Sequence, residues 1–276
     1  MDDLTTAWDQ RVESLDPVGH VTPVVAGADL RSYLAPRSGS GPVVPTSSLI
    51  GRARRVLGPR QRAAVKIAGT RLLAPRSVRQ FRSLLAGGAP LLLNLGSGTY
   101  NAPGWVNVDL WGLHRSWGVD PDVIWDLRRP LPLPDGSVRG VFLEHVLEHL
   151  PAPVGLAAAD QAFRLLEPGG VLRISVPDFG RYACSYADRV RGRGHASDLI
   201  STERPGRPTE LMAVAEVVYD HGHVSVWDAD TLIALMRAAG FVDVHECGFG
   251  SGTMQPVPDS PARRGESLYV EGTRTA

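Results

Sequence analysis

The stretch with the clearest chemical potential is Leu91–Leu110, in which a glycine turn is followed by a carboxylate. The apolar run Leu91–Leu95 is typical of a strand buried on both faces, and it stops at Gly96-Ser97-Gly98. Two residues without side chains let the backbone turn sharply and approach a ligand. A second strand-like run, 105–108, ends on Asp109, whose carboxylate can accept hydrogen bonds from both hydroxyls of a ribose. The pattern favours a nucleoside site over a plain surface turn.

The spacing argues against a dinucleotide cofactor. Only 13 positions (109 − 96) separate Gly96 from Asp109, against about 20 in the dinucleotide fingerprint. Tyr100 and Asn101 stand where a third glycine would fall, and Pro103-Gly104 leaves no room for a long helix between the two strands.

Other polar residues follow predicted strands at their carboxyl ends, where an open parallel sheet binds ligands. These candidates are Asp126 with Leu127, then Glu144 and His145, and then Asp178. His221 and His223 lie in the segment before the last predicted helix. A positioned histidine or carboxylate can remove a proton from an acceptor, typically for 10²–10⁴-fold in rate. We therefore predict that His145, Asp178, His221 and His223 carry the catalytic chemistry.

Each of these candidates has a structural alternative. His221 and His223 are equally suited to anchoring a loop, and Glu148 and His149 are predicted to brace the start of the following helix. A metal site from Glu144, His145, His221 and His223 is a further alternative, because alternating histidines in extended chain share a face. The sequence does not show that four ligands converge, so no metal is predicted.

The elements that position these residues alternate between strand and helix, which indicates an α/β fold with a mainly parallel sheet. The predicted strands are 91–95, 105–108, 122–126, 137–143, 171–176, 241–247 and 267–270. The predicted helices are 155–167, 178–191, 209–219 and 231–239, the last with Asp228 as N-cap. Residues 248–265 are predicted to form a long mobile loop.

Composition describes an ordinary globular protein. The chain has 276 residues, 43% hydrophobic and 21% charged, with zero net charge, so no global charge draws it to nucleic acid or membrane. No apolar run approaches the ~18 residues of a membrane span. Cys184 and Cys247 are too few for a disulfide framework or a zinc site. We expect a cytoplasmic protein, with a homodimer as a possible assembly.

The first 89 residues form a predicted extension with an acidic start, a Pro/Gly linker and basic helices. Residues 31–90 contain twelve basic residues and no acidic one, and 48–57 and 60–85 have helical periodicity. One interpretation is a solvated arginine face. Another is that the arginines bind a phosphorylated or nucleotide-linked substrate. Nucleic acid is less favoured, because no aromatic residues interleave the arginines.

Five segments together resemble the class I S-adenosylmethionine-dependent methyltransferases. They are LNLGSG, GWVNVD, VIWDLRRPLPLPDGSV, VFLEHVLEHL and LLEPGGVLRISVPD, and more closely they resemble the branch with a very short first crossover, often met near glycan and natural-product biosynthesis genes. The resemblance covers Leu91–Val270. It implies a Rossmann-like, seven-stranded sheet with the last strand antiparallel, in a domain at 90–276 with an insertion at about 178–228. It says nothing of residues 1–90.

The resemblance also implies a cofactor site for S-adenosylmethionine. Gly96, Ser97 and Gly98 would lie against the methionine part, Asp109 would hold the ribose hydroxyls, and Asp126 with Leu127 would flank the adenine. Asn94 and Glu144 complete this predicted set. Asn94 departs from the family, which usually has an acid two residues before the first glycine, and Tyr100 replaces the third glycine.

The predicted function is methyl transfer to a hydroxyl or amine of a small polar acceptor, a sugar or aminosugar. Two alternatives remain, a protein or RNA methyltransferase and a non-catalytic cofactor-binding subunit. The asparagine-proline-proline-tyrosine type of motif for base or amide nitrogens is absent, since Glu144-His145-Val146-Leu147 stands in its place.

Overall fold

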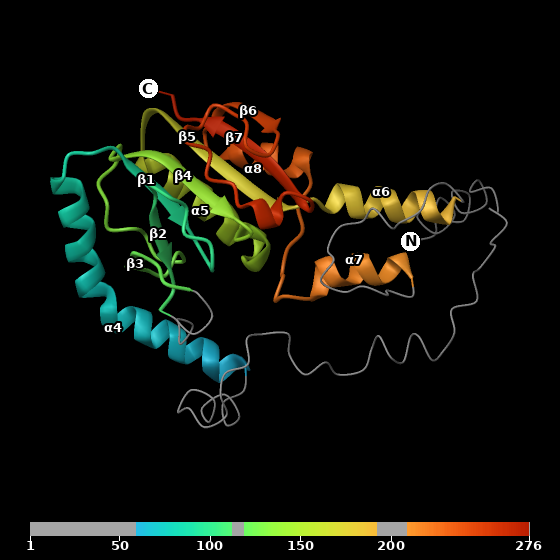
Figure 1. Ribbon diagram of the computed structural model, residues 1–276, viewed down its shortest axis with the longest axis horizontal. Helices are drawn as coiled ribbons and strands as arrows, with labels where there is room; N and C mark the ends of the chain where they lie inside the picture. The colour runs from blue at the N-terminus through green and yellow to red at the C-terminus, as the bar shows by residue number, and fades with distance from the viewer. Residues whose placement is uncertain (1–58, 112–118, 192–208, 276) are drawn as a thin grey trace, which may run out of the picture.

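The computed structural model describes residues 59–111, 119–191 and 209–275, which form a seven-stranded sheet with helices packed against it (Figure 1). The strand order is β3-β2-β1-β4-β5-β7-β6. Strands β1 to β5 pair in parallel, and β7 runs antiparallel to both β5 and β6. This confirms the predicted Rossmann-like sheet with an antiparallel last strand. The strands are β1 (Leu91–Leu95), β2 (Val106–Asp109), β3 (Val123–Ile124), β4 (Val138–Glu144), β5 (Leu166–Pro177), β6 (Val242–Cys247) and β7 (Ser267–Thr273).

The direction of strand order reverses between β1 and β4, which pair directly. In open α/β sheets a ligand crevice forms at such a switch point, outside the carboxyl ends of the strands. The glycine turn after β1 and the Glu144-His145 pair after β4 therefore lie at the same edge. Apolar side chains on both faces hold the sheet in the core, and Leu93, Val141 and Ile174 are fully buried.

Helix α5 (Ala152–Leu165) starts three residues earlier than predicted, because Pro151 and Pro153 stand at its first turn, where a missing N–H costs nothing. Helix α8 (Ala229–Ala238) begins two residues earlier than predicted, but its N-cap is confirmed: the carboxylate of Asp228 accepts a hydrogen bond from the N–H of Thr231 at 2.9 Å. Two further helices, α6 (Phe179–Val190) and α7 (Glu210–Tyr219), pack together through Tyr182, Ala213 and Val217. No helix in the described ranges is long and apolar enough to cross a membrane.

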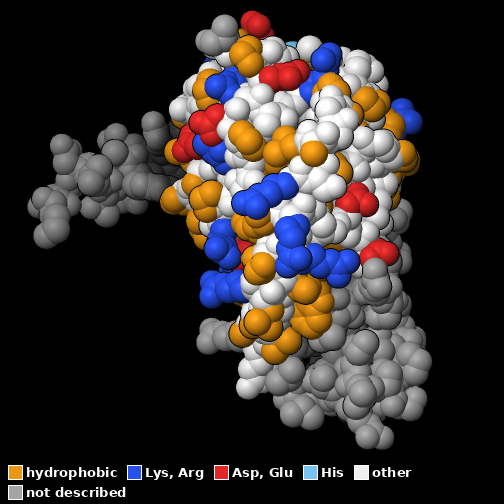
Figure 2. Space-filling view, turned by 90° about the vertical axis from the view of Figure 1, so that its left-hand side faces the viewer, with side chains coloured by type: hydrophobic (Ala, Val, Ile, Leu, Met, Phe, Trp, Pro, Cys, Tyr) orange, Lys and Arg blue, Asp and Glu red, His pale blue; other side chains and the backbone are white. Residues whose placement is uncertain are grey.

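The basic region contributes one long helix, α4 (Pro59–Ala86), which lies along the β3 end of the sheet, far from α6 and α7 (Figure 1). Phe81 is fully buried and contacts Trp125 edge to face, and the hydroxyl of Ser77 donates to the carbonyl of Ile124 at 2.7 Å. Arg71, Arg76, Arg79 and Arg82 of this helix are exposed, and Figure 2 shows Lys and Arg side chains gathered on this side of the molecule. The helix is thus part of the core, with a basic outer face. The helix predicted at 48–57 lies outside the described residues.

A buried charge cluster, here called the arginine cluster, consists of Arg173, Asp259 and Glu271. Arg173 on β5 is fully buried and donates to Asp259 through Nε at 2.6 Å and to Glu271 through Nη1 at 2.7 Å. It also donates to the carbonyls of Gly248 and Ser251, each at 3.0 Å. The prediction of a mobile loop at 248–265 is therefore wrong, because this arginine fastens the loop to the sheet from both ends.

Candidate active site

The glycine turn after β1 has the backbone that its residues predict. Gly96 and Gly98 have φ of 79° and 54°, in the left-handed region that favours glycine. The N–H of Gly98 donates to the Asp109 carboxylate at 2.7 Å. A Cβ on Gly96 would lie 2.5 Å from Cγ2 of Val146, so the turn packs directly against the segment that follows β4. The two strand ends are therefore in contact at the switch point.

Asp109 ends β2 and is half-buried. Its second carboxylate oxygen accepts from the N–H of Leu110 at 2.6 Å. Burial raises the pKa of Asp109, although the two backbone N–H donors oppose this shift. The hydroxyl of Ser97, in the same turn, is buried without a hydrogen-bond partner among the described residues. The turn thus presents a fixed carboxylate and an unused hydroxyl side by side.

Asp126 is buried and already paired. Arg128 holds it with two hydrogen bonds of 2.8 Å, from Nε and from Nη2. Burial acts to raise the pKa of Asp126, but the hydrogen bonds and charge of Arg128 outweigh it and lower the pKa. Leu127 is half-buried and packs against the main core. Both oxygens of the Asp126 carboxylate therefore already accept hydrogen bonds from Arg128. A base that contacts Asp126 would share these oxygens with Arg128.

Asn94 lies in a buried amide network. Its Nδ2 donates to the carbonyl of Tyr100 at 3.1 Å and to Oδ1 of Asn107 at 2.9 Å. Asn107 in turn donates to the Asp122 carboxylate at 3.0 Å. Both donors of the Asn94 amide therefore tie β1 to the turn and to β2. This bracing explains how an amide can replace the acid that the family usually has there.

Glu144 and His145 leave β4 at the edge of the sheet. Glu144 accepts from the N–H of Ser260 at 3.0 Å, and burial together with the nearby Asp259 raises its pKa. His145 has φ of 52°, and its Nε2 lies 2.7 Å from the hydroxyl of Ser267. Burial, with Arg263 nearby, lowers the pKa of His145 to about 2, so its ring is neutral.

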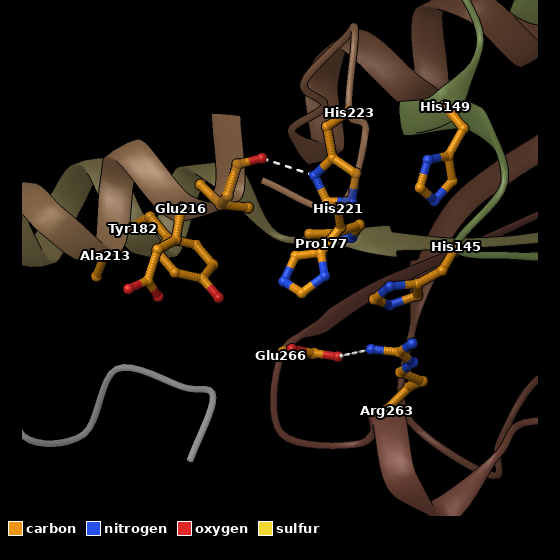
Figure 3. Close-up of a pocket in the computed structure, with 11 residues that line it drawn as sticks. His145, His149, Pro177, Tyr182, Ala213, Glu216, His221, His223, Arg263 and Glu266 are labelled. Atoms are coloured by element: carbon orange, nitrogen blue, oxygen red, sulfur yellow. Dashed lines mark hydrogen bonds and ion pairs between the residues drawn. The ribbon is translucent and has the colours of Figure 1, made fainter. Parts of the chain in front are cut away.

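A pocket of about 130 Å³ opens beside these two residues, and we call it the histidine pocket (Figure 3). The strand ends provide one wall, α6 and α7 provide another, and the ion pair between Arg263 and Glu266 closes the bottom at 2.7 Å. Eight of its eleven lining residues are polar. It is lined by His145, His149, Pro177, Tyr182, Ala213, Glu216, Val217, His221, His223, Arg263 and Glu266.

Three of the four predicted catalytic residues, His145, His221 and His223, are brought together in this pocket. Asp178 does not line it. Its carboxylate instead accepts from the N–H of Arg181 at 3.2 Å, in the first turn of α6. The structure thus gives Asp178 a helix-capping contact.

Glu148 and His149 were predicted to brace the start of the following helix, but the side chain of Glu148 makes no such contact. Glu148 is 1% exposed, and neither carboxylate oxygen has a hydrogen-bond partner among the described residues. Its backbone carbonyl does the bracing, accepting from the N–H of Val224 at 2.7 Å. Burial raises the pKa of Glu148 to about 8. His145, Glu148 and His149 lie within five residues between β4 and α5, and this closeness in the sequence is the signal that could have grouped them.

The chain matches the protein family described as "Methyltransferase domain" over residues 75–246. A comparison with the curated proteins finds no match. Among solved structures, the S-adenosylmethionine-dependent methyltransferase SibL in its apo form is 17% identical, with 70% of this chain and 54% of that chain covered and a TM-score of 0.39.

Two further structures are similar at the same level. A methyltransferase from Thermotoga maritima, described as a possible histamine N-methyltransferase, is 19% identical, with 72% and 88% of the two chains covered and a TM-score of 0.40. Human N-acetylserotonin methyltransferase in complex with S-adenosylmethionine is 17% identical, with 84% and 61% covered and a TM-score of 0.38. The chain thus spans only part of the length of SibL and of the human enzyme.

The residues present fit this cofactor. The Gly96–Gly98 turn is open to a ligand, with no heavy atom within 4 Å of a Cβ built on Gly98. The hydroxyl of Ser97 is unpartnered in the described part of the chain, and the Asp109 carboxylate is half-buried at the end of the next strand. A match over 172 of 276 residues (246 − 75 + 1), on this sheet, shows that the chain belongs to the methyltransferase-domain family and uses S-adenosylmethionine as its cofactor.

Proposed function

We propose that the protein transfers a methyl group from S-adenosylmethionine to a hydroxyl or amine of a small polar acceptor, a sugar or aminosugar, bound in the histidine pocket. One observation carries the proposal: a pocket with eight polar lining residues of eleven opens at the carboxyl ends of β4 and β5. Because Val146 packs against Gly96, the pocket begins one residue from the turn that we assign to the cofactor.

The polar lining favours an acceptor rich in hydroxyl or amino groups. A buried polar group that loses water without gaining a partner costs about 1–3 kcal/mol, so these side chains select a ligand that can pair with them. A flat apolar acceptor would offer no hydrogen bond to the Nε2 atoms of His149 and His223, whose Nδ1 atoms already contact backbone carbonyls. A sugar offers a donor or an acceptor at nearly every ring carbon.

The cofactor set follows from the turn and the neighbouring strand ends. We assign the ribose hydroxyls to Asp109, the methionine part to Gly96, Ser97 and Gly98, and the adenine to the Asp126-Leu127 end. When bound, S-adenosylmethionine supplies a methyl group on a sulfonium, and the carbon–sulfur electron pair returns to sulfur as the acceptor atom bonds to that carbon.

The histidines act on the acceptor. His145 is neutral and fixed by Ser267, so it orients a hydroxyl or amine by accepting or donating one hydrogen bond. His221 is exposed on the pocket rim, where its ring can take the proton of the acceptor and pass it to water. Correct alignment of acceptor, methyl carbon and sulfur supplies much of the remaining acceleration.

The test uses the full chain with ¹³C-methyl S-adenosylmethionine and separate pools of sugars, phosphorylated sugars, amines, protein and RNA. We expect the label in a sugar pool, with the methylated atom identified by NMR. His221→Asn should lower kcat about a hundredfold or more, and His245→Asn, an exposed histidine on β6, should leave kcat unchanged. Label found only in protein or RNA, or turnover only after a second protein is added, would overturn the proposal.

A further inference from the structure

Behind the histidines of the histidine pocket lies a buried carboxylate without a hydrogen-bond partner among the described residues. Glu148 is 1% exposed, and its two oxygens have no hydrogen-bond partner among the described residues. The nearest cationic candidates are histidine nitrogens, with Nδ1 of His145 at 3.4 Å and Nε2 of His223 at 4.0 Å from Oε1. A buried carboxylate in this state is costly unless a cation or a donor accompanies it. Something that binds in the pocket is therefore expected to complete it.

Backbone carbonyls orient two of the histidines near Glu148, namely His223 and His149. Nδ1 of His223 lies 2.7 Å from the carbonyl of Val217, and Nδ1 of His149 lies 3.4 Å from the carbonyl of Gly222. A carbonyl can only accept, so each Nδ1 carries the proton and each Nε2 keeps its lone pair. This assignment of tautomers follows from the hydrogen-bond partners. An Nδ1–H held by a backbone carbonyl is the usual support of a metal-binding imidazole.

The three side chains also converge. One ligand atom from each of Glu148, His149 and His223 lies within 4.8 Å of the other two. Zinc bonds to nitrogen and oxygen are about 2.0–2.2 Å long, so two ligands of one ion lie up to about 4 Å apart. Small side-chain rotations would bring all three into range. The rings of His149 and His223 already meet edge to face, with centroids 4.9 Å apart.

We propose that Glu148, His149 and His223 bind one divalent transition-metal ion, which holds the acceptor hydroxyl in the histidine pocket. Two imidazoles and one carboxylate suit zinc, cobalt, nickel or iron better than magnesium, which prefers oxygen ligands. Three protein ligands leave a coordination position for a water or a substrate oxygen. Because His149 and His223 line the pocket, that position faces the space that we assign to the acceptor.

The role of the ion rests on the proposed function and narrows it to hydroxyl acceptors. A metal ion acts as a Lewis acid on the bound hydroxyl oxygen and makes its proton easier to remove. The O–H bond breaks and the proton passes to His221, while the oxygen bonds to the methyl carbon as the bond from that carbon to the sulfonium sulfur breaks and its electron pair returns to sulfur. Neither Glu144 nor His145 is needed as a ligand, which separates this site from the four-residue set considered from the sequence alone.

The test measures metal binding directly on the full chain, after removal of metal with a chelator. Calorimetric titration with Zn²⁺ should give one ion per chain, and Co²⁺ should give a visible absorption band that an equal concentration of Mg²⁺ does not remove. Glu148→Gln, His149→Asn and His223→Asn should each weaken Zn²⁺ binding by about a hundredfold or more, since loss of a supporting contact alone costs 10–100-fold. His245→Asn is the matched control and should bind Zn²⁺ as the wild type does.

Zn²⁺ affinity that is unchanged in the variants that fold, or lowered equally by His245→Asn, would overturn the site. Circular dichroism shows which variants fold, and three independent substitutions guard against the loss of one. Full turnover on a hydroxyl acceptor by chelator-treated protein would refute the catalytic role of the ion and leave the proposed function intact. Specific metal binding without any sugar methylation would support the site and refute the proposed function.

Discussion

Two buried carboxylates of this protein, Glu271 and Glu148, have the same exposed fraction of 1% and opposite surroundings. Glu271 accepts from Arg173 at 2.7 Å and from the N–H of Thr253 at 2.6 Å. Glu148 has no hydrogen-bond partner in the described part of the chain, and the imidazole nitrogens of His145 and His223 lie 3.4 and 4.0 Å from its Oε1. The first carboxylate is satisfied by the fold. The second is left incomplete at a pocket, which is where a folded protein retains a binding site.

The difference separates two uses of polar burial. In the arginine cluster Nε, Nη1 and Nη2 of Arg173 each donate to an acceptor, and these hydrogen bonds hold the 248–265 loop against the sheet. Beside the histidine pocket, backbone carbonyls orient His149 and His223, whereas the carboxylate of Glu148 has no hydrogen-bond partner among the described residues, so a ligand can complete the site. Partly satisfied networks cost stability, so retention of one is most easily understood through binding.

The largest expected effect is the loss of the central cation of the arginine cluster. Arg173→Met leaves Asp259 and Glu271 buried together without a counter-charge, so the free energy of unfolding should fall by about 3–5 kcal/mol. Denaturant unfolding measures it. The matched control is Arg139→Met on β4, whose side chain is 63% exposed, and it should change the free energy of unfolding by less than about 0.5 kcal/mol. Similar decreases in the free energy of unfolding in the two variants would show that the arginine cluster does not specifically stabilise the fold.

The same substitution in the two clusters gives the sharpest comparison. Glu271→Gln loses charge-assisted hydrogen bonds and should lower the free energy of unfolding by about 1.5–3 kcal/mol. Because burial raises the pKa of Glu148 to about 8, its carboxyl group is mostly protonated at pH 7. Glu148→Gln therefore replaces one neutral, unpaired group by another, and the free energy of unfolding of the metal-free protein should fall by less than about 1 kcal/mol. Denaturant unfolding in the presence of a chelator compares them. A larger loss for Glu148→Gln than for Glu271→Gln would reverse the contrast.

The smallest effect concerns the two thiols, one of which touches the arginine cluster. Cys247 accepts from Nη1 of Arg173 at 2.9 Å, and burial, with Glu271 and Asp259 nearby, raises its pKa to about 11, although Arg173 opposes the shift. The thiolate is the reactive form, so Cys247 should resist alkylation at pH 8 and react only as the pH approaches about 11. Cys184 is exposed and should react at pH 8. Mass spectrometry of the alkylated chain measures the rate of alkylation at each cysteine. Equal rates for Cys184 and Cys247 at pH 8 would contradict the prediction.

Local signals predicted most of the sheet and the glycine turn of the proposed cofactor site. Apolar runs bounded by glycine and proline placed all seven strands, and the interval from Gly96 to Asp109 identified the turn and its carboxylate partner. These features depend on residues close together in the chain. The strand predicted at 122–126 is shorter in the structure. Only Val123–Ile124 form β3, because only Val108 and Asp109 of β2 pair with it.

The remainder depends on distant segments that no local pattern joins. The charge of Arg173 is balanced by Asp259, which lies 86 positions away in a stretch that resembles a loop. The tautomers of His149 and His223 depend on the carbonyls of Gly222 and Val217. The closeness of His145, Glu148 and His149 in the sequence could have grouped them, but it does not show whether Glu148 has a partner.

The central claim is that the sheet edge is divided, with the cofactor at the Asp109 end and the acceptor at the Glu148 end. Calorimetric titration of S-adenosylhomocysteine into the wild type, Asp109→Ala and Glu148→Gln tests this division in one measurement. We expect Asp109→Ala to weaken binding roughly ten- to a hundredfold, since a charge-assisted contact contributes about 1.5–3 kcal/mol, and Glu148→Gln to bind within threefold of the wild type. Unchanged affinity in folded Asp109→Ala, or a large loss in folded Glu148→Gln, would contradict it.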